Sequence, residues 1–460
     1  MEQCRASVAI LSAVAAAAIA TSAHGQNARD ELPIPSSPQQ DLTAIQRSFR
    51  PPAPPALTLF PQLREEMQDL PAFVRDTRVD INFRSYYRDV VTNDPNSVAV
   101  KEAWAAGGWA SIETGRILDM LSAGAVFYTS LPLYAPIEYD GAGLLLPGQF
   151  GYAVVGQLYG RLRLFEDHYI TGGRYYYDTP FLGPWDNRMT PQTFYGYTLT
   201  GTFGDSSHGG PSFRYGGGYI ATVKQRNANT FISMSRAAGA NVDNGVGVLG
   251  GLFTWGPLSL GAVEYYSQDT INIAYAEGQY GYRFPFDIDA ILALQYADQR
   301  STGLNLTNGG NSFATNQFGA RLDVGYQTGI FTVAYSVVNP NFNMENPWSG
   351  NPIYTNAMTL SFQRAGENAL MVGGSYVFTP VGLPGIAASI YYYQGWTGAS
   401  VGPPTVENEW DFTLDWRPNF KPLSGLWLRA RYGHSSINQN NMLSTTDEVR
   451  LTLNFALKLY

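Results

Sequence analysis

Arginines two residues apart are the side chains of this sequence whose type and spacing could most clearly do chemistry. Arg161 and Arg163 form one such pair, and Arg429 and Arg431 form another. A guanidinium binds a carboxylate through its charge and through two parallel hydrogen bonds. Rows of such groups in a narrow, polar passage favour anions over cations. The pairs therefore predict recognition of carboxylates.

The residue types that most enzymes need show no catalytic pattern. The sequence has no HExxH, GxSxG or Walker motif and no cysteine-rich metal spacing. Glu409, Asp411 and Asp415 share one face at a spacing of two, and paired acids can carry out acid–base chemistry. We interpret this row as solvated groups of a polar passage. The sequence thus predicts no enzyme, no cofactor and no metal site.

The arginines lie in segments in which apolar and polar residues alternate. One face of the last segment is apolar and comprises Val449, Leu451, Leu453, Phe455, Leu457 and Leu459. Arg450 lies on the opposite face, and similar alternation recurs from Val79 onward. Charged residues make up only 14% of the chain, and after the N-terminus no run of about 18 apolar residues could form a membrane helix. We therefore predict an all-β fold, a transmembrane β-barrel with a wet lumen and a lipid-facing exterior.

The connections between these segments alternate in length. Short turns are expected at 166–168, 255–257, 285–287, 327–329 and 380–385, and longer polar segments near 131–151, 179–192, 227–245, 300–315, 339–367, 397–407 and 435–446. Short periplasmic turns and long external loops are typical of bacterial barrels. A strand at Ala357–Phe362 would make about nineteen strands, whereas one loop over 339–367 leaves about eighteen antiparallel strands, the even number expected. A barrel of that size leaves an aqueous channel.

Closure of the barrel would bring the arginines of its first and last strands together. Arg84 and Arg88 lie on the first expected strand, Arg429 and Arg431 on the seventeenth, and Arg450 and Lys458 on the last. Further cations that face the lumen are expected at Arg161, Arg163, Arg214, Lys224 and Arg321. The alternative is that these cations only pair with Asp80, Asp323, Glu409 and Asp411. The contiguity of the three strands favours anion selectivity.

The N-terminal part of the chain differs from the rest. Residues 1–25 have the charged start, apolar run and small-residue cleavage site of a secretory signal peptide, and they contain Cys4, the only cysteine. Residues 26–75 are rich in proline and predict a mobile periplasmic tail. Residues 76–460 remain for the barrel. The net charge of −8 argues against nucleic-acid binding.

Several ordered fragments of the chain resemble the OprD-type outer-membrane porins. They are Asn82–Tyr87, Lys101–Ala105, Pro191–Gly196, Phe231–Met234, Ala237–Ala240, Ile273–Glu277, Gln295–Gln299, Pro347–Trp348, Tyr354–Thr355, Arg364–Glu367 and Asp447–Arg450. The resemblance implies a monomeric eighteen-stranded porin of the bacterial outer membrane, although the residues alone leave a trimer open. Its third loop would fold inward as Pro180–Met189, with Asp186 and Arg188. The family's basic ladder would here comprise Arg84, Arg429, Arg431 and Arg450, and could extend to Arg161, Arg163 and Arg321.

The resemblance implies passive uptake of small carboxylate-bearing solutes, including amino acids and aromatic acids, by a barrel surrounded by outer-membrane lipid. Related branches of the family pass sugars or chitin oligosaccharides, so a general or oligosaccharide-selective porin is an alternative. Two further alternatives are an outer-membrane enzyme and an adhesion barrel plugged by its proline-rich tail. One departure is Tyr460, which lies out of phase with the apolar face of the last strand.

Overall fold

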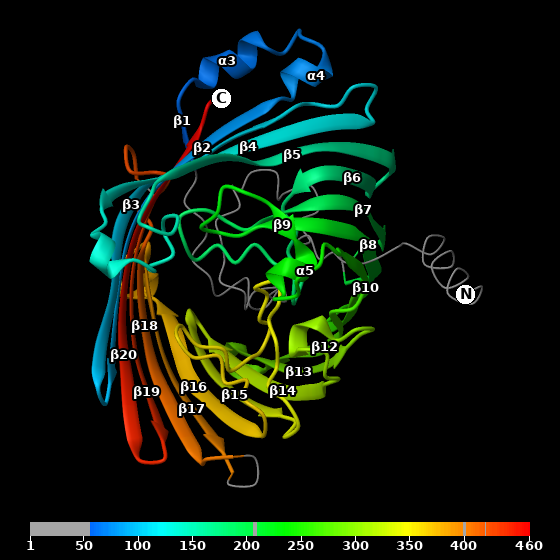
Figure 1. Cartoon of the computed structure of the whole chain (residues 1–460). Helices are drawn as coiled ribbons and strands as arrows, with labels where there is room; N and C mark the ends of the chain where they lie inside the picture. The colour runs from blue at the N-terminus through cyan, green and yellow to red at the C-terminus, as the bar shows by residue number, and fades with distance from the viewer. Residues whose placement is uncertain (1–55, 206–208, 399–401, 419) are drawn as a thin grey trace, which may run out of the picture.

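The fold is described by a computed structural model for residues 56–205, 209–398, 402–418 and 420–460 (Figure 1). The expected signal peptide and the first part of the expected tail, residues 26–55, lie outside the described residues. Twenty strands belong to one sheet. Two of them, β1 (Leu57–Thr58) and β9 (Ile232–Ser233), are only two residues long. The other strands form the barrel wall.

The wall consists of eighteen strands, each antiparallel to the next, as the sequence predicted. They are β2 (Arg78–Asp94), β3 (Ser97–Glu113), β4 (Leu121–Tyr134), β5 (Tyr152–Phe165), β6 (His168–Tyr175), β7 (Thr193–Gly204), β8 (Pro211–Lys224), β10 (Val246–Trp255), β11 (Leu258–Ser267), β12 (Ile271–Phe284), β13 (Ile288–Ser301), β14 (Ala314–Tyr326), β15 (Gly329–Val338), β16 (Glu367–Val377), β17 (Ile386–Thr397), β18 (Thr405–Trp416), β19 (Leu426–Gln439) and β20 (Met442–Lys458). Strand β20 pairs with β19 on one side and with β2 on the other, so the sheet closes.

Side chains alternate across the wall because successive residues of a strand point to opposite faces. On β20 the Arg450 side chain is buried on the lumen side, whereas Leu451 is 48% exposed on the outer side. Phe412 of β18 and Phe331 of β15 are also exposed on the outer side. An apolar exterior and a charged interior are the arrangement of a barrel that spans a membrane.

The segment 339–366 connects β15 to β16 and contains no wall strand, which confirms the even strand count. The prediction of a loop at 435–446 is wrong. Strands β19 and β20 run through this region and are joined by a tight turn at Asn440 and Asn441, both with positive φ. Asparagine tolerates this conformation, which suits a two-residue hairpin turn. The residues around the turn are as polar as those of a loop because strands that extend into water need no apolar face.

Two long connections fold into the barrel rather than away from it. The segment 176–192 joins β6 to β7 and meets the segment 339–366 in a bridge between Leu182 and Ser349. Phe181 and Trp348, one from each segment, are buried in a cluster with wall residues such as Tyr265. Figure 1 also shows α5 (Met234–Ala237) and β9 within the ring of strands. The expected inward third loop is therefore present, and the loop 339–366 folds inward with it.

The shorter helical segments lie in the connections and at the N-terminal side of the barrel. In the connections they are η2 (Ile137–Tyr139), η3 (Pro285–Asp287), η4 (Leu306–Asn308) and η5 (Thr379–Val381). Before the barrel they are α3 (Pro61–Glu66) and α4 (Ala72–Arg75). Part of the expected mobile tail thus has regular structure, at residues 57–58, 61–66 and 72–75. The sequence showed no periodicity there because each element is too short to give one.

Candidate functional site

The first and last strands of the barrel bring three arginines into one row. Arg450 of β20 is the cross-strand partner of Arg431 on β19 and of Arg88 on β2. Glu448 forms ion pairs with Arg88, at 2.6 Å between Nε and Oε1, and with Arg450. Arg431 donates from Nε to the Thr413 hydroxyl at 3.2 Å and forms no ion pair with any described residue. The row therefore consists of three guanidinium groups, with the carboxylates of Glu448 and Asp411 beside them.

Two arginines from inward loops face the same part of the lumen. The Arg226 guanidinium lies 3.9 Å from the centre of the Trp185 ring, and its Nη1 donates to the Asn187 side chain. Burial, followed by the neighbouring charges of Arg450 and Arg88, lowers the pKa of Arg226 to about 10. An arginine with this pKa remains charged at neutral pH. It therefore adds to the positive potential of the row.

Arg188, expected in the third loop, lies beside Arg226. Its Nε is buried and has no hydrogen-bond partner among the described residues. Burial, and next the charge of Arg226, lower the pKa of Arg188 well below its usual range. Arg226 was not predicted as a site residue because it lies in the connection after β8, whose path the sequence does not specify. Its signal was only a cation two residues beyond Lys224.

Arg84 holds a loop rather than lining an open passage. It forms an ion pair with Asp186, and each of the two side chains is only 3% exposed. Its Nε donates to Asn454 Oδ1 at 2.8 Å, and its Nη1 donates to the carbonyl of Arg188 at 2.6 Å. Arg84 thus ties the segment 176–192 to β2 and β20. Asp186, which was expected to line the passage, is the loop residue that forms this ion pair with Arg84.

The acidic row of β18 holds the other inward loop. The Glu409 carboxylate accepts hydrogen bonds from the backbone N–H groups of Thr359 and Leu360, each at 2.7 Å, and Asp411 accepts one from Met358 at 3.0 Å. Arg450 donates to the Met358 carbonyl at 3.0 Å. The interpretation of this row as solvated groups is wrong for Glu409 and Asp411, which are buried under the loop.

The Glu409→Gln substitution is expected to loosen the segment 339–366. A glutamine offers one acceptor oxygen and places an NH₂ group against backbone donors, which costs about 1–3 kcal/mol. Limited proteolysis should then cleave within 339–366 about tenfold faster than in the parent protein. Glu264→Gln, at a wall carboxylate bonded to Asn272, is the matched control. Equal cleavage of the two variants would contradict the assignment.

Three of the remaining expected arginines, Arg429, Arg321 and Arg161, have partners of their own on the wall. Arg429 makes two hydrogen bonds to Asp415, at 2.7 and 2.9 Å. Arg321 pairs with Asp323 at 3.0 Å and lies 4.5 Å from the Tyr354 ring. The Arg161 guanidinium lies 4.2 Å from the Tyr169 ring, while Nε of both Arg161 and Arg163 is buried without a described hydrogen-bond partner. The pairing alternative therefore holds for Arg321, although not for Arg431.

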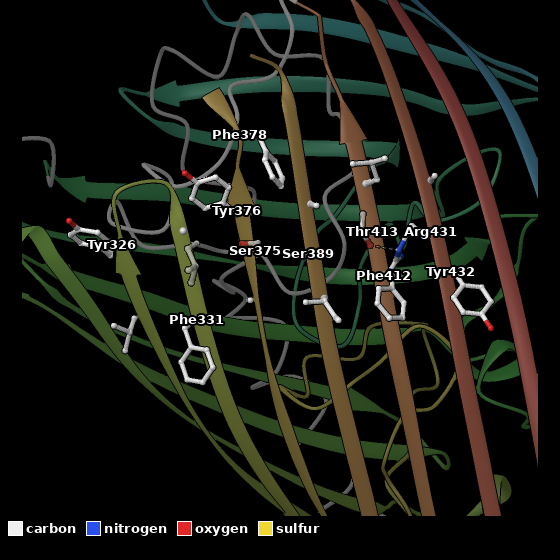
Figure 2. Close-up of a pocket in the computed structure, with 18 of the residues that line it drawn as sticks. Tyr326, Phe331, Ser375, Tyr376, Phe378, Ser389, Phe412, Thr413, Arg431 and Tyr432 are labelled. Atoms are coloured by element: carbon white, nitrogen blue, oxygen red, sulfur yellow. Dashed lines mark hydrogen bonds between the residues drawn. The ribbon is translucent and has the colours of Figure 1, made fainter. Parts of the chain in front are cut away.

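A hollow of about 1060 Å³ lies on the outer face of the wall between β14 and β20. Phe331, Phe412 and Tyr432, which line it, are each at least 40% exposed (Figure 2). Figure 2 also shows the hydrogen bond between Arg431 and Thr413 beside these aromatic side chains. Its lining is mostly apolar but includes Arg431 and Thr413, so the hollow lies directly across the wall from the arginine row.

Among the described residues, no group of three or more histidine, cysteine, aspartate or glutamate side chains is placed to hold a metal ion. Over the same residues, no helix has the length and apolar character needed to cross a membrane.

Solved structures share this fold. OccK9 (OpdG) of Pseudomonas aeruginosa is 22% identical and superposes with a TM-score of 0.74 over 85% of this chain and 100% of that chain. OpdK of P. aeruginosa, solved with vanillate, is 20% identical with a TM-score of 0.71 over 84% and 100%. OccAB1 of Acinetobacter baumannii is 16% identical with a TM-score of 0.73 over 86% and 100%.

No curated protein matches the chain by sequence. The family model described as "outer membrane porin, OprD family" matches residues 71–459. This match covers the whole barrel, including every strand of the wall. The chain therefore belongs to the OprD family of outer-membrane porins.

Proposed function

We propose that this porin takes up small carboxylate-bearing solutes, such as amino acids and aromatic acids, along the row Arg88–Arg450–Arg431. The observation that carries the proposal is the row of three neighbouring guanidinium groups, of which Arg88 and Arg450 pair with Glu448 while Arg431 forms no ion pair with a described residue. Arg226 adds charge from the connection after β8, and Arg188 lies beside it with a buried Nε that has no hydrogen-bond partner among the described residues. The relative OpdK, solved with the aromatic carboxylate vanillate, lends support by analogy.

Each arginine has a distinct part in this proposal. Arg431, whose described partner is only a hydroxyl, is the group with most hydrogen-bonding capacity left for a solute carboxylate. Arg88 and Arg450 are partly satisfied by Glu448, so they attract an anion without holding it tightly. Conduction needs sites that bind well enough to admit a solute and weakly enough to release it. The path lies within one chain, and we propose the single barrel, exported by the signal peptide at 1–25, as the working unit.

The Arg226→Gln substitution is expected to lower benzoate permeability several-fold. It removes one charge that faces the row, worth about 1 kcal/mol for an anion at a distance of a few ångströms in a wet lumen. Arg236→Gln is the matched control, because Arg236 lies in the same connection but is exposed and paired with Asp243. Benzoate flux into liposomes measures the effect. If both variants transport benzoate at the parent rate, Arg226 has no place in the path.

A further inference from the structure

A group of large apolar side chains is exposed where the barrel ends in its short turns. In α3, α4 and their flanks these residues are Leu59, Phe60, Leu70, Phe73 and Val74, each between 38% and 55% exposed. In the turn between β3 and β4 they are Ile117, Leu118 and Met120, of which Leu118 is 87% exposed. The surfaces of soluble proteins rarely expose so many large apolar side chains close together. We call residues 57–76 and 114–120 together the rim segment.

The rim segment is fixed to the barrel at its start by backbone pairing. Strand β1 runs parallel to the end of β20, with Leu57 opposite Leu457 and Thr58 opposite Lys458. The backbone N–H of Phe60 then donates to the carbonyl of Leu459 at 2.9 Å. Strand β19 stops pairing at Phe455, so β1 takes over the edge of β20 that β19 leaves open. The segment is therefore held in register and is not a free tail.

The second half of the rim segment is fixed to the turn between β3 and β4. The N–H of Gly115 donates to the carbonyl of Phe73 at 3.0 Å. A side chain at Gly115 would place its Cβ only 1.9 Å from the carbonyl oxygen of Ala72, so the close approach requires glycine. The hydroxyl of Tyr460 also donates to the carbonyl of Thr77 at 2.7 Å. Tyr460, which is out of phase with the apolar face of β20, thus contacts the backbone directly after residue 76 of the rim segment.

The apolar side of the rim segment continues the lipid-facing wall. Leu121 of β4 follows the turn directly, and Ile81 and Phe83 of β2 follow α4; all three are exposed on the outer face. In Figure 1, α3 and α4 lie outside the ring of strands and not across its opening. Glu65 lies two residues from the half-buried Leu63 on α3, which places it on the opposite side of the helix. The exposed apolar side chains of the segment therefore lie next to the outward-facing apolar side chains of the wall.

We infer that the rim segment is an interfacial anchor that inserts Phe60, Phe73 and Leu118 among the acyl chains of the periplasmic leaflet of the outer membrane. Short turns mark the periplasmic end of a bacterial barrel. Short amphipathic segments bind there by burying an apolar face in the boundary between headgroups and acyl chains. The occupant of the exposed surface is phospholipid. The inference does not depend on the solute that the lumen carries.

Fluorescent labelling of the full chain in liposomes tests this anchor. A Cys4→Ser background carries either Phe60→Cys or, as matched control, Glu65→Cys, each labelled with an environment-sensitive fluorophore. Phosphatidylcholine with a shallow spin label should quench the label at position 60 at least about threefold more than the label at 65. Equal quenching at the two positions would overturn the anchor. Quenching at 60 that falls as the protein-to-lipid ratio rises would also overturn it, by assigning the surface to a second copy.

A triple variant distinguishes a membrane anchor from a segment that plugs the lumen. Phe60→Ser, Phe73→Ser and Leu118→Ser together remove exposed side chains and no described hydrogen bond. Thermal unfolding of the barrel should occur at a lower temperature than the parent's in phospholipid bilayers, with unchanged single-channel conductance. An unchanged unfolding temperature, or a rise in conductance, would contradict the inference.

Discussion

Reversing the charge at position 431 with Arg431→Glu is expected to change the porin from anion-preferring to cation-preferring. Arg431 completes the row with Arg450 and Arg88 and forms no ion pair with a described residue. A unit charge about 6 Å from a solute contributes about 1–3 kcal/mol at an effective dielectric constant of roughly 20 to 80. Reversal changes the energy of an anion near the row by about twice that amount. The permeability of the anion relative to the cation should therefore fall at least about tenfold.

Reversal potentials across planar bilayers under a sodium benzoate gradient measure this change. Arg300→Glu is the matched control, because it makes the same charge change at an exposed residue paired with Asp298. Arg431→Gln should give an intermediate shift. Circular dichroism and heat-modifiable migration confirm that each barrel has folded. A benzoate preference that survives Arg431→Glu in a folded barrel would exclude Arg431 from the path.

The Arg84→Ala substitution is expected to release the inward loop 176–192 and widen the lumen. It leaves Asp186 buried without its ion-pair partner, and breaking a buried pair from one side costs about 3–5 kcal/mol. The loop should leave its place, so single-channel conductance should rise and discrimination between benzoate and chloride should fall. Conductance recordings in potassium chloride and in potassium benzoate give both quantities.

A double substitution is the control for the loop anchor. Arg84→Met with Asp186→Leu replaces both charges by apolar groups of similar size, which is often neutral for stability. The double variant should restore the low conductance of the parent, because the loop is again compatible with its place. If Arg84→Ala alone leaves conductance and discrimination unchanged, Arg84 and Asp186 do not position the loop.

Much of the wall could be predicted from the sequence because alternation is a local property. The faces of β18, β19 and β20 follow directly from residues such as Phe412 and Arg450. Closure then made the first and last strands neighbours, and the observed register does place Arg431, Arg450 and Arg88 together. The prediction of a loop at the polar run 435–446 was wrong because polarity outside the membrane does not distinguish loops from strands.

The roles of individual charges could not be predicted, because they depend on where the loops go. Glu409 looks like any lumen carboxylate in the sequence, yet three backbone and hydroxyl donors of the segment 339–366 fill its oxygens. Arg84 belonged to the expected ladder, yet it holds Asp186. Arg226 belongs to the site only because the connection between β8 and β10 folds into the lumen. A loop's fold is a tertiary property that a two-residue period does not encode.

The rate of uptake of galacturonate relative to galactose most directly tests the claim that the lumen selects carboxylates. The two sugars share a ring and differ at C6, where one bears a carboxylate and the other a hydroxymethyl group. In liposomes that contain the parent porin, the account predicts faster uptake of galacturonate, and loss of this difference in Arg431→Gln. Faster uptake of galactose, or equal uptake of both sugars by the parent porin, would contradict it.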